Sequence, residues 1–257
     1  MSVLLETKEV SKSYGSYQVL RDISIVISEG EFISVVGPNG AGKTTLVNVL
    51  TGLAPPSSGS VLFKGSDVSY FGPVQLAKMG MARAFQLVHV FPELTVGETI
   101  AVAALSKSER NWNLWRSARS FNDVEDRVKD VARIFGLQRK LHTIAGQLSQ
   151  GEKKLLDVAS AFALKPDVIL LDEPTSGVST ADKHGIMRTL IAAAREAGIG
   201  ALIQVEHDMD LVSEYSDRVV AIFGGKILAD KPPNEFFADP HLIETVVGKA
   251  PGSQTCW

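Results

Sequence analysis

The stretch GPNGAGKTT, from Gly37 to Thr45, constrains the fold more than any other part of the sequence. It lies between an apolar run, 32–36, and a helical pattern over 43–53. Four apolar residues share one face of that expected helix: Leu46, Val47, Leu50 and Leu53. A buried strand, a glycine-rich loop and a helix in this order are typical of a phosphate-binding loop in an α/β fold.

The residue types in this loop suit a nucleotide. Glycines let successive backbone N–H groups turn inward around phosphate oxygens, and the helix start adds the positive end of its dipole. Lys43 adds a mobile charge, and the Thr44 hydroxyl is expected to hold Mg²⁺. A glycine-rich turn that binds nothing is the alternative. We predict nucleotide contacts along the whole loop: Gly37, Pro38, Asn39, Gly40, Ala41, Gly42, Lys43, Thr44 and Thr45.

Two adjacent carboxylates, Asp172 and Glu173, end the apolar run of VILLDEP. The carboxyl ends of strands are where α/β sheets present ligand-binding groups. We expect Asp172 to hold Mg²⁺ through water while Glu173 polarises the attacking water, the two pointing to opposite sides. A solvated strand end before a turn at Pro174 is the alternative.

The segment LSQGEKK, 148–154, has the pattern of a helix start. Ser149 as N-cap with Glu152 three residues later forms a capping box, and the helix should stop before Pro166. The same geometry points free N–H groups and the Ser149 hydroxyl at an anion, and Gly151 allows close approach. The structural and the anion-binding interpretations are compatible.

Composition limits the classes of function. The 257 residues contain no apolar run approaching the ~18 of a membrane span. The N-terminus lacks a secretory signal and the single cysteine is Cys256, so we expect a cytosolic location. A net charge of −3 gives no global attraction to nucleic acid, which we do not expect as a partner.

Residue patterns along the chain indicate an α/β core with an inserted helical lobe. Alternating Ile23, Ile25 and Ile27 predict a half-buried strand, and 95–164 is mostly helical in pattern. Short apolar strands follow at 168–172 and 201–205, and Gly224-Gly225 predicts a hairpin between 219–223 and 226–229. We predict four segments: core with the phosphate loop at 1–85, helical lobe at 86–165, core again at 166–229, and an appendage at 230–257.

Taken in order, these motifs resemble the nucleotide-binding subunits of ATP-binding cassette (ABC) transporters along nearly the whole chain. The resemblance implies a P-loop NTPase (RecA-like) α/β core with an N-terminal antiparallel β subdomain and an inserted α-helical lobe. It assigns the signature motif to 148–152 and further single-residue roles to Gln86, His207 and Tyr14. The last of these, in KSYG, would stack on adenine. Alone, each of the three has an ordinary structural explanation.

The resemblance also implies a mechanism. Two subunits would hold each ATP between the phosphate loop of one and Ser149, Gln150 and Gly151 of the other, because a γ-phosphate held from one side keeps oxygens that a second helix N-terminus can satisfy. Glu173 would act on water and His207 would contact the γ-phosphate. Gln86 would contribute to the metal site and link nucleotide state to a membrane partner. Lys43 and Mg²⁺ complete the catalytic set.

Two residues depart from the common family pattern. Gln150 replaces a frequent glycine, and Ser179 stands where aspartate or asparagine is usual. The serine is the more consequential change, since the usual side chain helps set geometry across the pair.

Three segments, at 82–100, 205–222 and 232–248, resemble ATPases of importers for branched-chain amino acids, urea and short-chain amides. That subfamily implies membrane permease subunits, a second ATPase, a periplasmic binding protein and a position on the cytoplasmic face of the membrane. An export or lipid-extraction ATPase and a soluble ABC protein are the alternatives. The segment 110–116, rich in tryptophan and arginine, would lie near lipid or a membrane subunit, or pack within the lobe.

Overall fold

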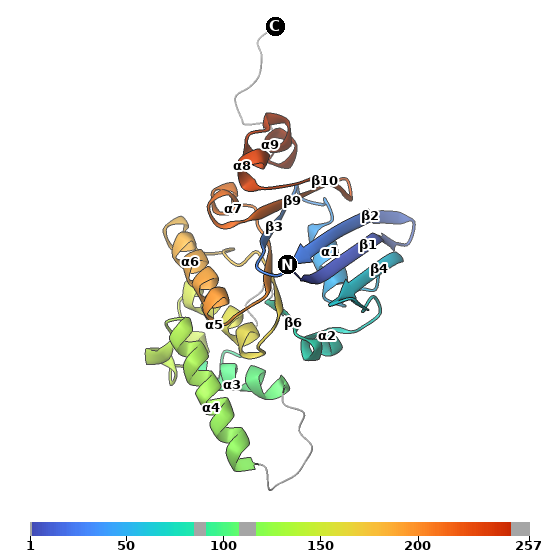
Figure 1. Cartoon of the computed structure of the whole chain (residues 1–257). Helices are drawn as coiled ribbons and strands as arrows, with labels where there is room; N and C mark the ends of the chain where they lie inside the picture. Colours follow the sequence, from blue (N-terminus) through green and yellow to red (C-terminus); the bar gives the residue numbers. More distant parts are fainter. Residues whose placement is uncertain (1, 85–90, 108–116, 248–257) are drawn as a thin grey trace. The chain divides into compact units, whose positions relative to one another are not determined.

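The computed structural model describes residues 2–84, 91–107 and 117–247 (Figure 1). The chain forms two compact units. The first contains residues 1–73 and 200–257, and the second contains residues 74–199. The second unit holds strands as well as helices, so the division at residues 86 and 165 stays a prediction.

An antiparallel sheet with strand order β2-β1-β4-β5 belongs to the first unit (Figure 1). Its strands are β1 (Val3–Tyr14), β2 (Tyr17–Ser28), β4 (Ser58–Phe63) and β5 (Ser66–Asp67). The predicted alternation in β2 is confirmed, because Ile23, Ile25 and Ile27 are buried while Val26 between them is 42% exposed. One face of this sheet therefore packs inward and the other faces solvent.

The same unit contains parallel strands in the order β9-β3-β8. They are β3 (Phe32–Val36), β8 (Ala201–Val205) and β9 (Arg218–Phe223). Every residue of β3 and β8 is buried, as expected for strands covered on both faces. The predicted hairpin is confirmed: β10 (Lys226–Lys231) pairs antiparallel with β9, and Gly224 and Gly225 have φ of 55° and 79°, as a type I′ turn requires.

Helix α1 (Lys43–Leu50) is shorter than the predicted 43–53. The helix ends at Leu50 with Thr51 as its C-cap, because Gly52 directly after the cap adopts a left-handed φ of 71°. The Gly52 N–H donates to the Val49 carbonyl at 3.2 Å and the Leu53 N–H to the Asn48 carbonyl at 2.9 Å, the pair of bonds of a Schellman motif. Leu53 is therefore 48% exposed and does not join the apolar face of the helix.

Three short helices complete the first unit: α7 (Met209–Tyr215), α8 (Pro233–Phe237) and α9 (Pro240–Val247). Phe236 of α8 and Leu242 and Val246 of α9 join one buried cluster with Val36 and Val212. The described part of the predicted appendage, residues 230–247, thus adds to the core of this unit.

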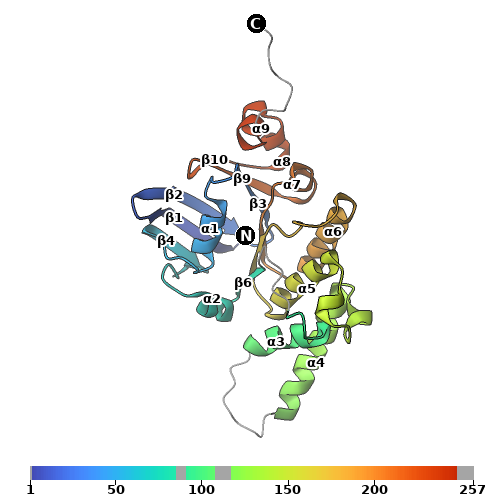
Figure 2. The same cartoon turned by 180° about the vertical axis from the view of Figure 1, so that it is seen from behind.

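The second unit combines two parallel strands, β6 (Met81–Ala84) and β7 (Val168–Asp172), with helices. The helices are α2 (Pro73–Met79), α3 (Val96–Lys107), α4 (Ser117–Ile134), α5 (Gln150–Ala163) and α6 (Thr180–Glu196), with 3-10 turns at Gln138–Lys140 and Ala145–Gln147 (Figure 2). The predicted helical character of 95–164 is confirmed where the chain is described. Phe135 and Phe162 meet edge to face with ring centroids 5.0 Å apart, near the end of α4 and within α5. Across the described ranges, no helix is both long and apolar enough to cross a bilayer.

Candidate functional site: a phosphate loop and a capped helix tip

The phosphate loop connects β3 to α1, as the sequence predicts. Gly37, Gly40 and Gly42 all have positive φ, at 150°, 79° and 109°. A Cβ at Gly37 would lie 2.2 Å from the carbonyl oxygen of Ile222, so the loop lies directly against the backbone of β9. The glycines therefore serve both the backbone conformation and this close approach.

Lys43 folds over the loop that precedes it. Its side chain is buried, and Nζ donates to the carbonyl oxygens of Gly37 at 2.7 Å and Pro38 at 3.1 Å. This places an ammonium group within the loop, where it can reach a phosphate. Thr44, in the first turn of α1, is exposed and can offer its hydroxyl to a ligand.

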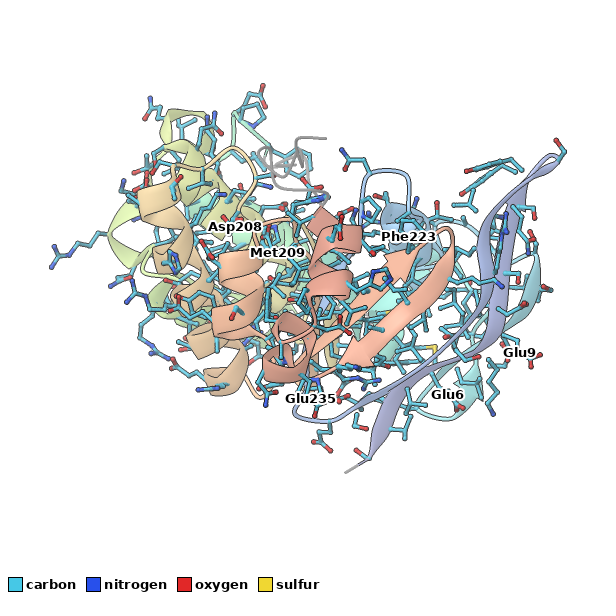
Figure 3. All side chains as sticks on the ribbon, turned by 90° about the horizontal axis from the view of Figure 1, so that it is seen from above. Glu6, Glu9, Asp208, Met209, Phe223 and Glu235 are labelled. Carbon is cyan, nitrogen blue, oxygen red and sulfur yellow. The ribbon has the colours of Figure 1, made fainter. Side chains whose placement is uncertain are left out.

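His207 lies at the turn between β8 and α7, and its side chain is exposed. The buried carboxylate of Glu206 shapes this turn, because Oε1 accepts the N–H of His207 at 2.8 Å and that of Asp208 at 3.2 Å. Figure 3 labels Asp208 and Met209, where the turn enters α7. Glu206 was not predicted from the sequence. Its signal is a carboxylate directly after the apolar strand ALIQV.

Tyr14 ends β1 with its side chain 51% exposed. The Lys12 ammonium lies 5.1 Å from the centre of the ring, a cation-π distance. An exposed aromatic ring at a strand end offers a face on which a base can stack. The described geometry is thus compatible with the adenine contact predicted for Tyr14, which stays a prediction.

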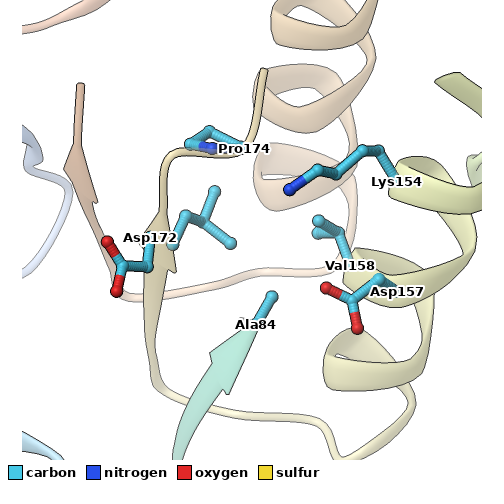
Figure 4. Close-up of a pocket in the computed structure, with 7 residues that line it drawn as sticks. Ala84, Lys154, Asp157, Val158, Asp172 and Pro174 are labelled. Atoms are coloured by element: carbon cyan, nitrogen blue, oxygen red, sulfur yellow. The ribbon is translucent and has the colours of Figure 1, made fainter. Parts of the chain in front are cut away.

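In the second unit, β7 ends at Asp172, the first of the two adjacent carboxylates. Asp172 is 3% exposed, and its carboxylate points away from the side of the strand where Lys154 and Asp157 lie (Figure 4). Glu173 follows with a left-handed φ of 51°, unusual for a residue with a side chain. Its carbonyl accepts from Lys154 Nζ at 3.4 Å, which ties the strand end to helix α5. A strained backbone at such a position is common in functional sites.

Arg83, which the sequence analysis did not single out, contacts Asp172. Its Nη2 donates to Asp172 Oδ2 at 2.7 Å, and the two side chains are 9% and 3% exposed. Strands β6 and β7 are parallel neighbours, with Arg83 opposite Leu170. The sequence feature that could have identified Arg83 is a charged residue in the otherwise apolar run of β6.

The predicted capping box at the start of α5 is confirmed. Ser149 Oγ accepts the Glu152 N–H at 3.3 Å, and Glu152 Oε2 accepts the Ser149 N–H at 3.0 Å. Lys140 also donates to the Glu152 carboxylate. These bonds, first that from Lys140 and then that from the Ser149 N–H, lower the pKa of Glu152. The side chain that caps the helix is therefore held ionised.

A cavity of about 480 Å³ opens beside this helix tip, and every residue lining it belongs to the second unit. Ser149, Gln150 and Gly151 line one part of it, and Ser179 and Asp182 line another. Ser179 is the N-cap residue of α6, and its Oγ donates to Asp182 Oδ2 at 2.6 Å. The serine at this unusual position thus bonds within its own helix start and borders the same hollow as the signature residues.

The structure distributes the predicted site residues over both units. The phosphate loop, Tyr14 and His207 belong to the first unit, whereas Asp172, Glu173 and the tip 149–151 belong to the second. Gln86 and the segment 110–116 lie outside the described residues.

Comparisons with known proteins identify the family. The family model described as ABC transporter matches residues 20–176. The high-affinity branched-chain amino acid transport ATP-binding protein LivG of Salmonella typhimurium is 31% identical, covering 96% of this chain and 98% of the relative. The probable LivG protein of Methanocaldococcus jannaschii is 30% identical with the same coverage. The arginine transport ATP-binding protein ArtM of Bacillus subtilis is 31% identical, covering 92% of this chain and 95% of the relative.

Solved structures confirm the predicted fold class. An ATP-binding cassette of an ABC transporter in its ADP conformation matches with a TM-score of 0.82 at 27% identity, over 97% of this chain and 100% of that chain. The family match covers more than half of the sequence, and relatives at 30–31% identity span nearly all of it. The chain therefore belongs to the ABC transporter family, as an ATP-binding subunit with ATPase activity.

Proposed function

We propose that this subunit powers import of branched-chain amino acids or related small polar solutes by ATP-driven pairing with a second ATPase. The names of the LivG relatives support the substrate class, while the name of ArtM, an arginine transport protein, shows that similar chains serve other amino acids. In the proposed complex, the ATPases sit on the cytoplasmic face of transmembrane permease subunits, and a periplasmic protein delivers the solute. Those partners select the substrate.

The observation that carries the pairing is the capped tip of α5. Ser149, Gln150 and Gly151, at the positive end of the helix dipole, line a hollow rather than a packed interior. We infer that this tip binds the γ-phosphate of an ATP held by the phosphate loop of the other copy. Ser179, bordering the same hollow, would then lie at the interface between copies.

Within one copy, we propose that Lys43 and the loop N–H groups hold the phosphates while Tyr14 stacks on the base. The residues predicted for the metal are of the types that Mg²⁺ takes, since this ion binds a few protein oxygens and completes its shell with water and substrate phosphates: Thr44 would offer a hydroxyl, Asp172 a carboxylate and Gln86 an amide. Bound Mg²⁺ would neutralise phosphate charge. Glu173 would orient and deprotonate water, and His207 would contact the γ-phosphate.

The Glu173→Gln variant tests the pairing. We expect it to bind ATP and to hydrolyse it about 10²- to 10⁴-fold more slowly, because a general base is lost. ATP-bound dimers should therefore accumulate. Light scattering after size-exclusion chromatography reports the mass with and without ATP. Unchanged turnover would remove Glu173 from its assigned role.

A matched pair of substitutions at Gly151, made in the Glu173→Gln protein, tests the helix tip. A Cβ there would meet only Ile186 Cδ1, at 3.8 Å, an ordinary van der Waals distance. Gly151→Ala should therefore fold, and any loss of dimer in it measures the steric part of the effect, since Gly151 allows the close approach of the phosphate. Gly151→Asp should also fold, because an acidic residue suits a helix N-terminus, but its charge should repel the phosphate and abolish the ATP-dependent dimer. An intact dimer in the aspartate variant would contradict the proposed function.

A further inference from the structure

Arg83 is a charged residue in a strand built for burial. Its neighbours Met81, Ala82 and Ala84 are buried, and the arginine side chain itself is only 9% exposed. Its Nη2 lies 2.7 Å from Oδ2 of Asp172, the residue to which the proposed function assigns the metal. Strand β6 therefore places a positive charge beside the carboxylate that the proposed function assigns to Mg²⁺.

Burial makes this contact consequential. A carboxylate that is 3% exposed has lost most of its hydration, so its charge needs an opposite charge or hydrogen bonds nearby. The guanidinium supplies both in one contact. When bound, Mg²⁺ would bring positive charge of its own. The need for Arg83 should therefore be greatest while Mg²⁺ is absent.

We propose that Arg83 is the resident counter-charge of Asp172, and that it keeps this carboxylate from repelling the phosphates of a nucleotide that arrives without its metal. The inference rests on the proposed function, in which Asp172 faces the nucleotide. Arg83 is a positioning residue, since it acts through Asp172. We therefore expect the Arg83 side chain to affect the binding of metal-free nucleotide far more than the binding of nucleotide with Mg²⁺.

The test compares the affinity of a fluorescent ATP analogue in EDTA with that in saturating Mg²⁺. Arg83→Met should weaken binding in EDTA by about tenfold, equivalent to about 1.4 kcal/mol, and change binding in Mg²⁺ by less than about threefold. Arg83→Lys, which retains the charge, should restore most of the EDTA affinity. Arg83→Met with Asp172→Asn should restore it as well, because the Asp172 charge that Arg83 compensates is removed with it.

The matched control is Arg133→Met. Arg133 also makes a 2.7 Å contact from Nη2 to a carboxylate, that of Glu196, but these side chains are 58% and 48% exposed. This substitution should leave both affinities unchanged. Circular dichroism establishes that each variant is folded.

Arg83→Met removes one partner of a buried pair and can fail to fold. In that case Asp172→Asn carries the test, because it removes the negative charge and retains Arg83, and it should tighten binding in EDTA by a similar factor. An equal loss in EDTA and Mg²⁺ for Arg83→Met, or no change in EDTA for Asp172→Asn, would overturn the inference. Failure of the proposed function is distinguishable: if Asp172 does not hold Mg²⁺, the difference between the affinities in EDTA and in Mg²⁺ should be the same for Asp172→Asn and for the wild-type protein.

Discussion

Replacing Gly37 by alanine tests whether the phosphate loop is held by its contact with β9. The new Cβ would lie 2.2 Å from the carbonyl oxygen of Ile222, well inside the 3.0 Å below which some atom must move. The overlap is between a Cβ atom and a backbone carbonyl oxygen, so no flexible side chain can move to relieve it. The φ of 150° at Gly37 is also a conformation that residues with a side chain rarely adopt.

The cost can be worked out by comparison with Gly40 and Gly30, which have φ of 79° and 90° but no atom within 4 Å of a built Cβ. Alanine at either position carries only the penalty of the left-handed conformation, about 1–2 kcal/mol. At Gly37 the overlap adds the about 1–3 kcal/mol typical of overpacking. We therefore expect Gly37→Ala to lower the free energy of unfolding by about 2–5 kcal/mol in total.

Urea unfolding of the three variants measures these costs, and titration with the fluorescent ATP analogue measures binding. Gly30→Ala, in the turn between β2 and β3, should bind the analogue as the wild-type protein does. Gly37→Ala should be the least stable of the three variants. It should also bind the analogue weakly, because its phosphate loop must move away from β9. Equal stability of the Gly37→Ala and Gly40→Ala proteins would refute the argument from the Ile222 contact.

Three further perturbations address other parts of the account. Lys43→Ala should abolish tight nucleotide binding, and retained micromolar affinity in a calorimetric titration would count against the phosphate loop. The hydrogen bonds that lower the pKa of Glu152 mean that its carboxylate stabilises the fold at pH above the ordinary glutamate range, and that this contribution is lost as pH falls through the lowered pKa. The wild-type protein should therefore be more stable than Glu152→Gln near neutral pH, and the difference should vanish in acid; a gap constant with pH would contradict this. Arg218→Met removes charge-assisted hydrogen bonds to Asp230, at 2.6 Å, and to Glu31, at 3.0 Å. It should lower the free energy of unfolding in urea by about 1–3 kcal/mol. A loss below about 0.5 kcal/mol, the range of ordinary surface substitutions, would show that these bonds do not stabilise the fold.

Features set by neighbouring residues could be predicted from the sequence. The capping box at Ser149 and Glu152 and the hairpin turn at Gly224 and Gly225 each depend on a few consecutive residues, and both are confirmed. The predicted end of α1 at residue 53 was wrong. Leu53 continues the apolar pattern of the helix, but the left-handed backbone at Gly52 ends it earlier.

Features set by distant pairings could not be predicted in this way. Arg83 and Asp172 are 89 residues apart, and only the parallel pairing of β6 and β7 brings them together. Glu206 was missed for a different reason. Its carboxylate bonds the N–H groups of the next two residues, and nothing in the one-letter sequence separates such a turn from an ordinary solvated strand end.

Mixing two defective proteins tests most directly whether an ATP is shared between two copies. One protein carries Lys43→Ala and the other Gly151→Asp, each in the Glu173→Gln background. Alone, neither should form an ATP-dependent dimer, because both of its sites are damaged. Mixed, they should form a dimer with one intact site, made of the phosphate loop of one copy and the helix tip of the other. Absence of that mixed dimer, while the Glu173→Gln protein itself dimerises with ATP, would contradict the account.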